Sequence, residues 1–158
     1  MSVILPGSYD PITLGHLDVI RRVCESEELV YVVAFINPDK KYMFSLEDRV
    51  AMMMLALDEF DNCFVSYSFG RVVDYMREHE IDRIVKGYRN DADLEYERIQ
   101  AEYNKHHGGY DTTFLLTSPE YKDVSSTRVR ELLLSGGDAS GLLHPRVLDY
   151  IKDNHFFD

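Results

Sequence analysis

The stretch PGSYDPITLGHLD, residues 6–18, brings glycine, hydroxyl and imidazole groups together between a short apolar run and a helical pattern. Gly7 allows a ligand to approach the backbone closely, and Ser8 offers a hydroxyl and an amide hydrogen. Gly15 and His16 fall in the first turn of the predicted helix, where free N–H groups and the helix dipole favour an anion. A histidine there can donate a hydrogen bond to a phosphate. The stretch is therefore typical of a phosphate site, although a capped turn with an incidental histidine would also account for it.

Three other segments carry cations or hydroxyl groups directly after predicted strands: NPDKKYMF at 37–44, KGYR at 86–89 and YKDVSSTR at 121–128. Each has an ordinary structural interpretation as well, because paired lysines are usually solvated and hydroxyl residues that open a helix are usually caps. In the second segment, however, two cations flank a glycine at a strand end, which is where a parallel sheet binds ligands. Together the segments favour one convergent anion site. The remaining strand end, residues 69–73, is apolar and is expected to line a pocket wall.

These segments require a scaffold in which apolar, β-rich runs alternate with amphipathic helices. The predicted strands are Val3–Leu5, Leu29–Ile36, Cys63–Tyr67, Ile81–Val85 and Thr112–Leu116. The predicted helices are Leu14–Cys24, Leu46–Asp58, Arg71–His79, Ala92–His106, Ser126–Ser135 and Pro145–Asn154. The alternation predicts an α/β fold, a single doubly wound domain over residues 1–158 whose five parallel strands are covered by helices on both faces. Ligands bind such sheets at the carboxyl ends of the strands, near the point where the strand order reverses.

Composition and missing motifs exclude several classes of function. The net charge of −11 argues against a nucleic-acid binder, which usually carries a broad basic face. No apolar run reaches the roughly 18 residues of a membrane span. The chain opens without a charged-then-apolar leader, and Cys24 and Cys63 are isolated, so we expect a cytoplasmic protein with reduced thiols. The chain contains no G-x-x-x-x-G-K-[ST], G-x-G-x-x-G, G-x-S-x-G or H-E-x-x-H motif, which argues against the P-loop, dinucleotide-binding, hydrolase and metalloprotease classes.

Four motifs together resemble those of the bacterial phosphopantetheine adenylyltransferases, in the nucleotidyltransferase superfamily. PGSYDPITLGH at 6–16 resembles that family's PG[ST]FDPxTxGH signature, and DKKYMF at 39–44 resembles its S-KKPMF loop. KGYR at 86–89 with DLEYE at 93–97 resembles its RGLR…DFEYE block, and VSST at 124–127 resembles the ISST segment of the wider superfamily. The motifs occur in the family's order and near its spacing, across almost the whole chain.

The resemblance implies a Rossmann-like nucleotidyltransferase fold and a specific reaction. That family transfers the adenylyl group of ATP to 4′-phosphopantetheine, giving dephospho-coenzyme A and pyrophosphate, a step of coenzyme A biosynthesis. The resemblance also implies a homohexamer and makes coenzyme A a candidate feedback inhibitor. It implies Mg²⁺ as the cofactor, and because no carboxylate cluster in the sequence has metal spacing, we expect the ion to be carried on the ATP phosphates.

Site residues can be carried over by position. His16 corresponds to the histidine that stabilises the transition state and Lys40 to the lysine that holds the acceptor phosphate, so these are the expected catalytic residues. The expected acceptor contacts are Ser8, Lys40, Val72 and Lys86. The expected ATP contacts are Ser8, Tyr9, His16, Gly87, Tyr88, Arg89, Glu97, Tyr121, Lys122, Asp123, Val124, Ser125, Ser126 and Thr127.

The chemistry agrees with these roles, because the acceptor is already an anion and needs neither a strong base nor a covalent nucleophile. Catalysis then reduces to aligning two anions and neutralising charge at the α-phosphate. Three departures from the family pattern qualify the expectation. Lys86 replaces an arginine and lacks the planar fork of a guanidinium, which predicts that the acceptor is bound more weakly or is less well oriented. Tyr42 replaces a proline and is expected to loosen the lysine loop, and Arg71 replaces a leucine beside the pantetheine arm, where it changes the pocket lining.

Two alternatives remain open. The first is another adenylyl- or cytidylyltransferase of the superfamily, acting on an acceptor such as nicotinamide mononucleotide or glycerol 3-phosphate. Those enzymes commonly carry H-x-G-H, whereas this chain has Thr13 at the first histidine position, and this favours the pantetheine branch. The second is a nucleotide- or coenzyme-sensing module that kept the fold and lost the chemistry, against which the presence of His16, Lys40 and Arg89 argues.

Overall fold

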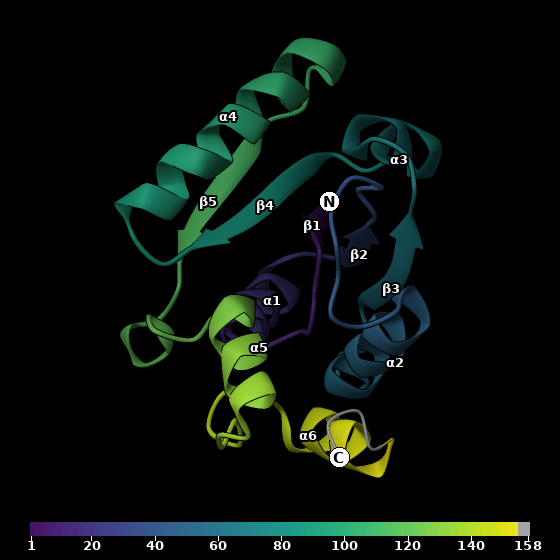
Figure 1. Ribbon diagram of the computed structural model, residues 1–158. Helices are drawn as coiled ribbons and strands as arrows, with labels where there is room; N and C mark the ends of the chain where they lie inside the picture. The colour runs from purple at the N-terminus through teal and green to yellow at the C-terminus, as the bar shows by residue number, and fades with distance from the viewer. Residues whose placement is uncertain (155–158) are drawn as a thin grey trace.

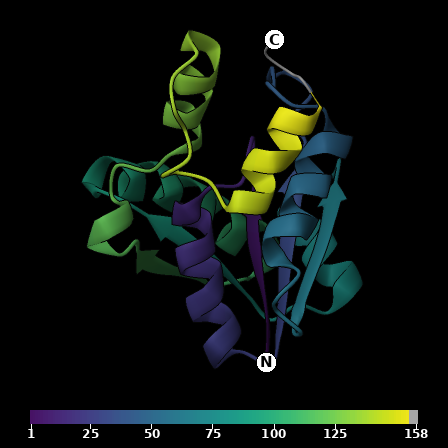
Figure 2. The same ribbon diagram turned by 90° about the horizontal axis from the view of Figure 1, so that it is seen from below.

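The computed structural model describes residues 1–154 and contains one sheet of five parallel strands with helices on both faces (Figures 1 and 2). The strands are β1 (Ser2–Gly7), β2 (Leu29–Phe35), β3 (Cys63–Ser68), β4 (Arg83–Tyr88) and β5 (Thr112–Leu116). The helices are α1 (Leu14–Ser26), α2 (Leu46–Leu57), α3 (Val72–His79), α4 (Asp91–Gly108), the 3₁₀ turn η1 (Pro119–Tyr121), α5 (Ser126–Ser135) and α6 (Pro145–Asp153). The predicted doubly wound α/β fold is confirmed. The last four residues of the expected 1–158 domain lie outside the described part.

The strand order is β3-β2-β1-β4-β5, and all neighbouring pairs are parallel. The chain moves outward from β1 through β2 to β3, then crosses back to place β4 on the other side of β1. The order therefore reverses between β1 and β4, and the carboxyl ends of these two strands diverge there. In an open parallel sheet this is the position at which ligands bind.

Successive side chains of β1 pack against different layers. Val3 and Leu5 join the core beneath α1, α2, α5 and α6, whereas Ile4 joins a second core with Tyr75 and Met76 of α3. Figure 2 shows α1, α2 and α6 in front of the sheet, on the face away from α3 and α4. Burying each such aliphatic side chain stabilises the fold by roughly 1.5–3 kcal/mol, so the apolar strands hold both helical layers in place.

The prediction of β4 is displaced. The sequence predicted a strand over Ile81–Val85, but the strand runs over Arg83–Tyr88 and its end pairs with β5 from Phe114 to Leu116. The prediction stopped at Val85, before Gly87, yet Gly87 lies inside the strand, where α1 packs closely against it. A Cβ on Gly87 would lie 2.8 Å from a Val19 methyl carbon. Lys86 and Tyr88 are therefore strand residues rather than loop residues.

The other predicted elements agree with the structure to within two residues at each end, and the short turn η1 was not predicted. Gly136 ends α5 with φ of 74°. That left-handed conformation is accessible to glycine without steric cost.

Candidate active site

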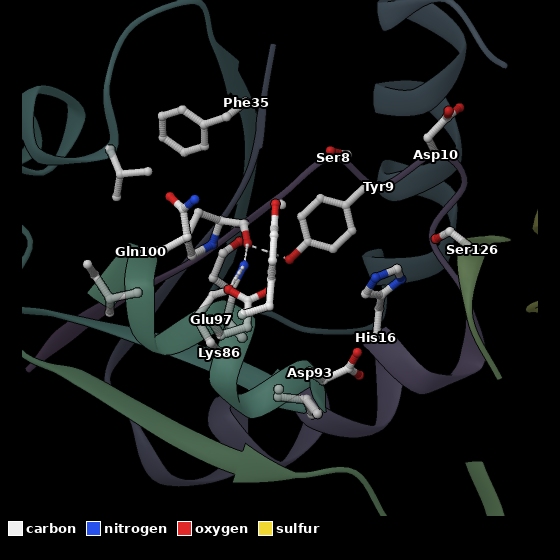
Figure 3. Close-up of a pocket in the computed structure, with 18 of the residues that line it drawn as sticks. Ser8, Tyr9, Asp10, His16, Phe35, Lys86, Asp93, Glu97, Gln100 and Ser126 are labelled. Carbon is white, nitrogen blue, oxygen red and sulfur yellow. Dashed lines mark hydrogen bonds and ion pairs between the residues drawn. The ribbon is translucent and has the colours of Figure 1, made fainter. Parts of the chain in front are cut away.

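The carboxyl ends of β1 and β4 open into a cavity of about 810 Å³. All four segments singled out from the sequence, 6–18, 37–44, 86–89 and 121–128, contribute residues to its lining. Figure 3 shows Phe35 and Gln100 on one side of the cavity and His16 and Ser126 on the other. The topology thus brings together phosphate-compatible groups that are far apart in the sequence.

His16 is oriented by a capping box at the start of α1. The Thr13 hydroxyl accepts a hydrogen bond from the His16 backbone N–H, and the Thr13 backbone N–H donates to Nδ1 of His16 at 3.0 Å. Because Nδ1 accepts, the proton of the neutral ring must be on Nε2. Burial, and then the positive charges of Lys86 and Arg89, lower the pKa of His16 from 6.5 to about 4. The side chain at neutral pH is therefore an uncharged Nε2–H donor that lines the cavity.

Tyr9 forms the wall behind this imidazole. Its ring centroid lies 4.8 Å from that of His16, and its hydroxyl donates to the carbonyl oxygen of Leu5 at 2.9 Å. Burial raises the pKa of Tyr9 well above its ordinary value. The residue has φ of 48°, a left-handed conformation that is uncommon for a bulky side chain. These contacts hold Tyr9 so that its ring, rather than its hydroxyl, is offered to a ligand.

Lys40 reaches back over the end of β1 from the loop after β2. Its Nζ donates to the Ser8 hydroxyl at 3.1 Å. The loop is fastened by Asp10, whose carboxylate accepts the backbone N–H groups of Met43 and Phe44 at 2.8 and 2.9 Å. A primary ammonium and a hydroxyl are thus held together at the cavity, an arrangement suited to the oxygens of a phosphate.

The opposite wall is built by β4 and α4, and its cations have carboxylate partners. Lys86 Nζ lies 3.2 Å from Glu97 and donates to the carbonyl oxygen of Pro6 at 3.1 Å (Figure 3). Arg89 Nε lies 3.2 Å from Asp93, whose carboxylate also accepts the Arg89 backbone N–H. The two pairs orient both cations at the end of β4 before any ligand is present.

The segment after β5 is anchored to α1 by Asp18. Its carboxylate accepts the backbone N–H and the hydroxyl of Ser118, both at 2.9 Å, and pairs with Arg22. Burial alone would raise the pKa of Asp18, but the hydrogen bonds from Ser118 and Arg22 outweigh it and hold the pKa below its ordinary value. The Ser126 hydroxyl then donates to the carbonyl oxygen of Pro11 at 2.8 Å. The start of α5 is thereby fixed against the β1–α1 connection.

The cavity gathers most of the residues that the sequence singled out. Those that line it are Ser8, Tyr9, His16, Lys40, Val72, Lys86, Gly87, Arg89, Glu97, Val124, Ser125, Ser126 and Thr127. Those that do not are Tyr88, Tyr121, Lys122 and Asp123. Lys122 and Asp123 are exposed at the end of the 3₁₀ turn, so ATP contacts by these four residues stay a prediction that the cavity does not support.

Three residues of the site were missed. Asp10 is 2% exposed, and its carbonyl oxygen accepts a hydrogen bond of 2.8 Å from Arg130, which lines the cavity. Arg49, also 2% exposed, donates to the carbonyl oxygen of Ser8. For Arg49 a signal existed, because its spacing from Leu46 and Met53 places a charge on the apolar face of the helix. Asp10 lies in the motif of residues 6–16, although no role was expected for it, and nothing comparable marks Arg130.

Two departures from the family pattern also take their places in the cavity wall. The hydroxyl of Tyr42 accepts the backbone N–H of Asn37 at 2.9 Å and closes the lysine loop, which argues against the expectation that Tyr42 loosens it. Arg71 lines the cavity as expected of the pocket wall, and its guanidinium pairs with Asp74 and donates to the hydroxyl of Tyr103.

Within residues 1–154 no three His, Cys, Asp or Glu side chains are grouped closely enough to hold a metal ion. Delivery of Mg²⁺ on the ATP phosphates stays a prediction. No helix in the described part of the chain is both long and apolar enough to cross a membrane.

Comparison with known proteins gives one family match and several structural relatives. The model of a family described as cytidylyltransferase-like matches residues 4–132. The nicotinic acid mononucleotide adenylyltransferase of Plasmodium falciparum, solved in complex with NaAD, superposes with a TM-score of 0.73 at 17% identity, covering 99% of this chain and 97% of its own. A proposed nicotinate-nucleotide adenylyltransferase of Vibrio parahaemolyticus gives a TM-score of 0.71 at 17% identity, covering 99% and 94%. At these identities the likeness shows the fold.

Proposed function

The chain belongs to the cytidylyltransferase-like family of nucleotidyltransferases, and from that premise we propose that it transfers the adenylyl group of ATP to 4′-phosphopantetheine. The products are dephospho-coenzyme A and pyrophosphate. A phosphate oxygen of the acceptor attacks the α-phosphorus of ATP in line. The new P–O bond forms as the bond to the β-phosphate oxygen breaks, and pyrophosphate leaves with the electron pair.

The observation that carries the proposal is the neutral His16, held as an Nε2–H donor between two groups of cations. Its Nδ1 is occupied by the Thr13 backbone N–H, and Nε2 makes no hydrogen bond to any residue from 1 to 154. An uncharged donor that needs no reorganisation stabilises charge that develops on a non-bridging oxygen of the α-phosphate. Because the acceptor is already ionised, a proton-accepting imidazole is not needed. A ring whose pKa is about 4 is consistent with this role and poorly suited to that of a general base at neutral pH.

The remaining roles follow from the two walls. Lys40 and Ser8, bonded to each other, are proposed to bind the acceptor phosphate together with Lys86. Arg89 and the amide groups at the start of α5 are proposed to bind the triphosphate. Both anions would then meet beside His16. Holding them aligned there would lower the entropic part of the activation barrier, because the two reactants no longer have to meet in solution. Mg²⁺ carried on ATP would neutralise part of the triphosphate charge.

A second candidate acceptor is nicotinic acid mononucleotide, which the names of both structural relatives suggest. Thr13 argues against it, because the resemblance assigns a histidine at that position to the other branches of the superfamily. In this structure Thr13 is 1% exposed and serves as the helix cap that orients His16. The sequence motifs and this cap together favour the phosphopantetheine branch.

An acceptor screen tests the proposal. The protein is incubated with ATP and, in separate reactions, 4′-phosphopantetheine, nicotinic acid mononucleotide, nicotinamide mononucleotide or glycerol 3-phosphate, and pyrophosphate release is measured. We expect release with 4′-phosphopantetheine and its loss in His16→Ala. Release with a mononucleotide and none with 4′-phosphopantetheine would overturn the acceptor assignment. Tight ATP binding with no turnover on any acceptor would instead indicate a sensing module.

A further inference from the structure

Arg49 presents an unusual problem for a helix residue, because it is a buried cation without an anion. Its side chain is 2% exposed, and it forms no ion pair with any of the residues from 1 to 154. Its Nε is buried without a hydrogen-bond partner in this same part of the chain. A buried charge is costly unless it is paired or hydrogen-bonded. The contacts that Arg49 does make must therefore be the reason for its position.

Those contacts are an aromatic face and a backbone carbonyl. The guanidinium carbon of Arg49 lies 3.9 Å from the centre of the Tyr42 ring, close enough for a cation–π contact in a desolvated site. Nη1 of Arg49 donates to the carbonyl oxygen of Ser8 at 3.1 Å. Arg49 thus connects the lysine loop, through Tyr42, to the end of β1, through Ser8. A planar guanidinium can stack and donate simultaneously, which an ammonium cannot.

Tyr42 is fixed on its other edge as well. Its hydroxyl accepts the backbone N–H of Asn37 at 2.9 Å, which ties the beginning of the loop to its end. Lys40, which lies between these two residues in the sequence, has its Nζ 5.4 Å from the Tyr42 ring centre and donates to the Ser8 hydroxyl. The ring therefore lies near two cations, both of which also contact Ser8.

We propose that Tyr42 and Arg49 are positioning residues that hold Ser8 and Lys40 in register for the anionic phosphate of the acceptor. The inference rests on the proposed function and extends it to two residues outside the expected set of acceptor contacts. Arg49 orders the backbone of Ser8, Tyr42 orders the loop that carries Lys40, and the stack between them couples the two. Because no carboxylate among residues 1–154 forms an ion pair with Arg49, its charge also favours an anion at Ser8.

The test compares ligand affinities in Tyr42→Leu, Tyr42→Phe and a control, Tyr67→Leu. Tyr67 is a half-exposed tyrosine of β3 that does not line the cavity. Binding of 4′-phosphopantetheine and of a non-hydrolysable ATP analogue is measured separately by calorimetry on the full chain. Loss of the stack in Tyr42→Leu is expected to raise the dissociation constant of the acceptor about tenfold. The dissociation constant of the ATP analogue should stay within about twofold of its value in the unaltered protein. Tyr42→Phe keeps the ring and is expected to recover most of the acceptor affinity, and Tyr67→Leu should bind both ligands as the unaltered protein does.

A readout without ligands accompanies the affinities. In Tyr42→Phe the Asn37 amide loses its acceptor, so its hydrogen exchange should accelerate, and this holds even if Tyr42→Leu fails to fold. Three outcomes would overturn this inference and leave the proposed function standing. They are an unchanged acceptor affinity in Tyr42→Leu, an equal weakening of the binding of both ligands, or an unchanged hydrogen exchange of the Asn37 amide in Tyr42→Phe. Failure of the unaltered protein to bind 4′-phosphopantetheine would overturn the proposed function and, with it, the acceptor role given to these residues.

Discussion

The two walls of the cavity hold their cations in opposite ways. On the wall formed by β4 and α4, Lys86 pairs with Glu97 and Arg89 pairs with Asp93. On the wall formed by the loop after β2, Lys40 contacts a neutral hydroxyl. Behind it Arg49 contacts a ring and a carbonyl oxygen. Both walls carry positive charge, but among residues 1–154 only the cations of the first wall form ion pairs with carboxylates.

This difference has a consequence for ligand binding. An anion that reaches the β4 wall must share its cations with carboxylates that repel it, so part of the attraction is offset before binding begins. An anion that reaches the loop wall meets cations without such competitors. A compact phosphate with two charges is therefore best placed against the loop wall, where it also reaches Lys86 of the paired wall. Arg89 of the paired wall suits a longer polyphosphate that brings its own counter-ion.

The largest effect is expected at His16, which lies between the walls. His16→Ala removes the Nε2–H donor from the α-phosphate and should lower kcat by about 10²–10³-fold, with little change in either KM. Steady-state kinetics with ATP and 4′-phosphopantetheine measure this. A KM effect without a kcat effect would assign His16 to ground-state binding and remove it from the chemical step.

On the paired wall, the effect of removing Lys86 should be partly reversed by also removing the charge of Glu97. Lys86→Met leaves Glu97 facing the incoming phosphate without a partner, and the acceptor KM should rise about 30-fold or more, because much of the loss comes from the unpaired charge. Adding Glu97→Gln to Lys86→Met should lower the acceptor KM again by roughly tenfold, because the unpaired carboxylate is then gone. The acceptor KM of the double variant decides the point, and a double variant no better than Lys86→Met would show that Glu97 does not compete with the ligand.

The unpaired wall predicts a simple loss. Lys40→Met should raise the acceptor KM about 10- to 30-fold through the loss of one charged hydrogen bond. Glu97→Gln should not recover it, since that carboxylate belongs to the other wall. The same kinetic assay applies. Equal rescue of both lysine variants by Glu97→Gln would mean that the walls share one charge network, and the contrast between them would disappear.

The electrostatic effect of the paired wall should be visible in the titration of His16. In the free protein its imidazole signals should titrate near pH 4 in an NMR experiment, and Lys86→Met should move the midpoint upward because one of the lowering charges is removed. The folded pKa lies below the unfolded value of 6.5, so this group's contribution to stability is complete above pH 6.5. It is lost as the pH falls through about 4. A midpoint near 6.5 in the unaltered protein would contradict the burial of the ring.

The smallest effect concerns the fork that Lys86 lacks. Lys86→Arg restores the planar donor that the phosphopantetheine adenylyltransferases have at this position. It should lower the acceptor KM by about threefold, since a bidentate contact replaces a single one. An unchanged acceptor KM would show that the Lys86–Glu97 pair already orients the ligand as well as a guanidinium would.

The sequence alone was sufficient for the alternation of strands and helices, for the convergence of residues 6–18, 37–44, 86–89 and 121–128, and for the position of His16 at the start of the first helix. All of these depend on local patterns: apolar periodicity, helix caps, and polar residues placed after strands. It failed at the end of the fourth strand, which was predicted to stop at Val85. Pairing with β5 extends the strand through Gly87 to Tyr88, and the close approach of Val19 leaves room only for a glycine there.

Only the tertiary structure decided how the charges are distributed around the site. Glu97 and Asp93 lie on a helix that the sequence does not pair with particular cations, and the neutral state of His16 depends on burial and on Lys86 and Arg89. Tyr42 was expected to loosen its loop because it replaces a proline, and no local pattern showed its stack on Arg49, which joins two segments across space. Local sequence specifies which groups a segment offers. Their protonation, partners and uncompensated charge are set by neighbours that the fold supplies from distant parts of the chain.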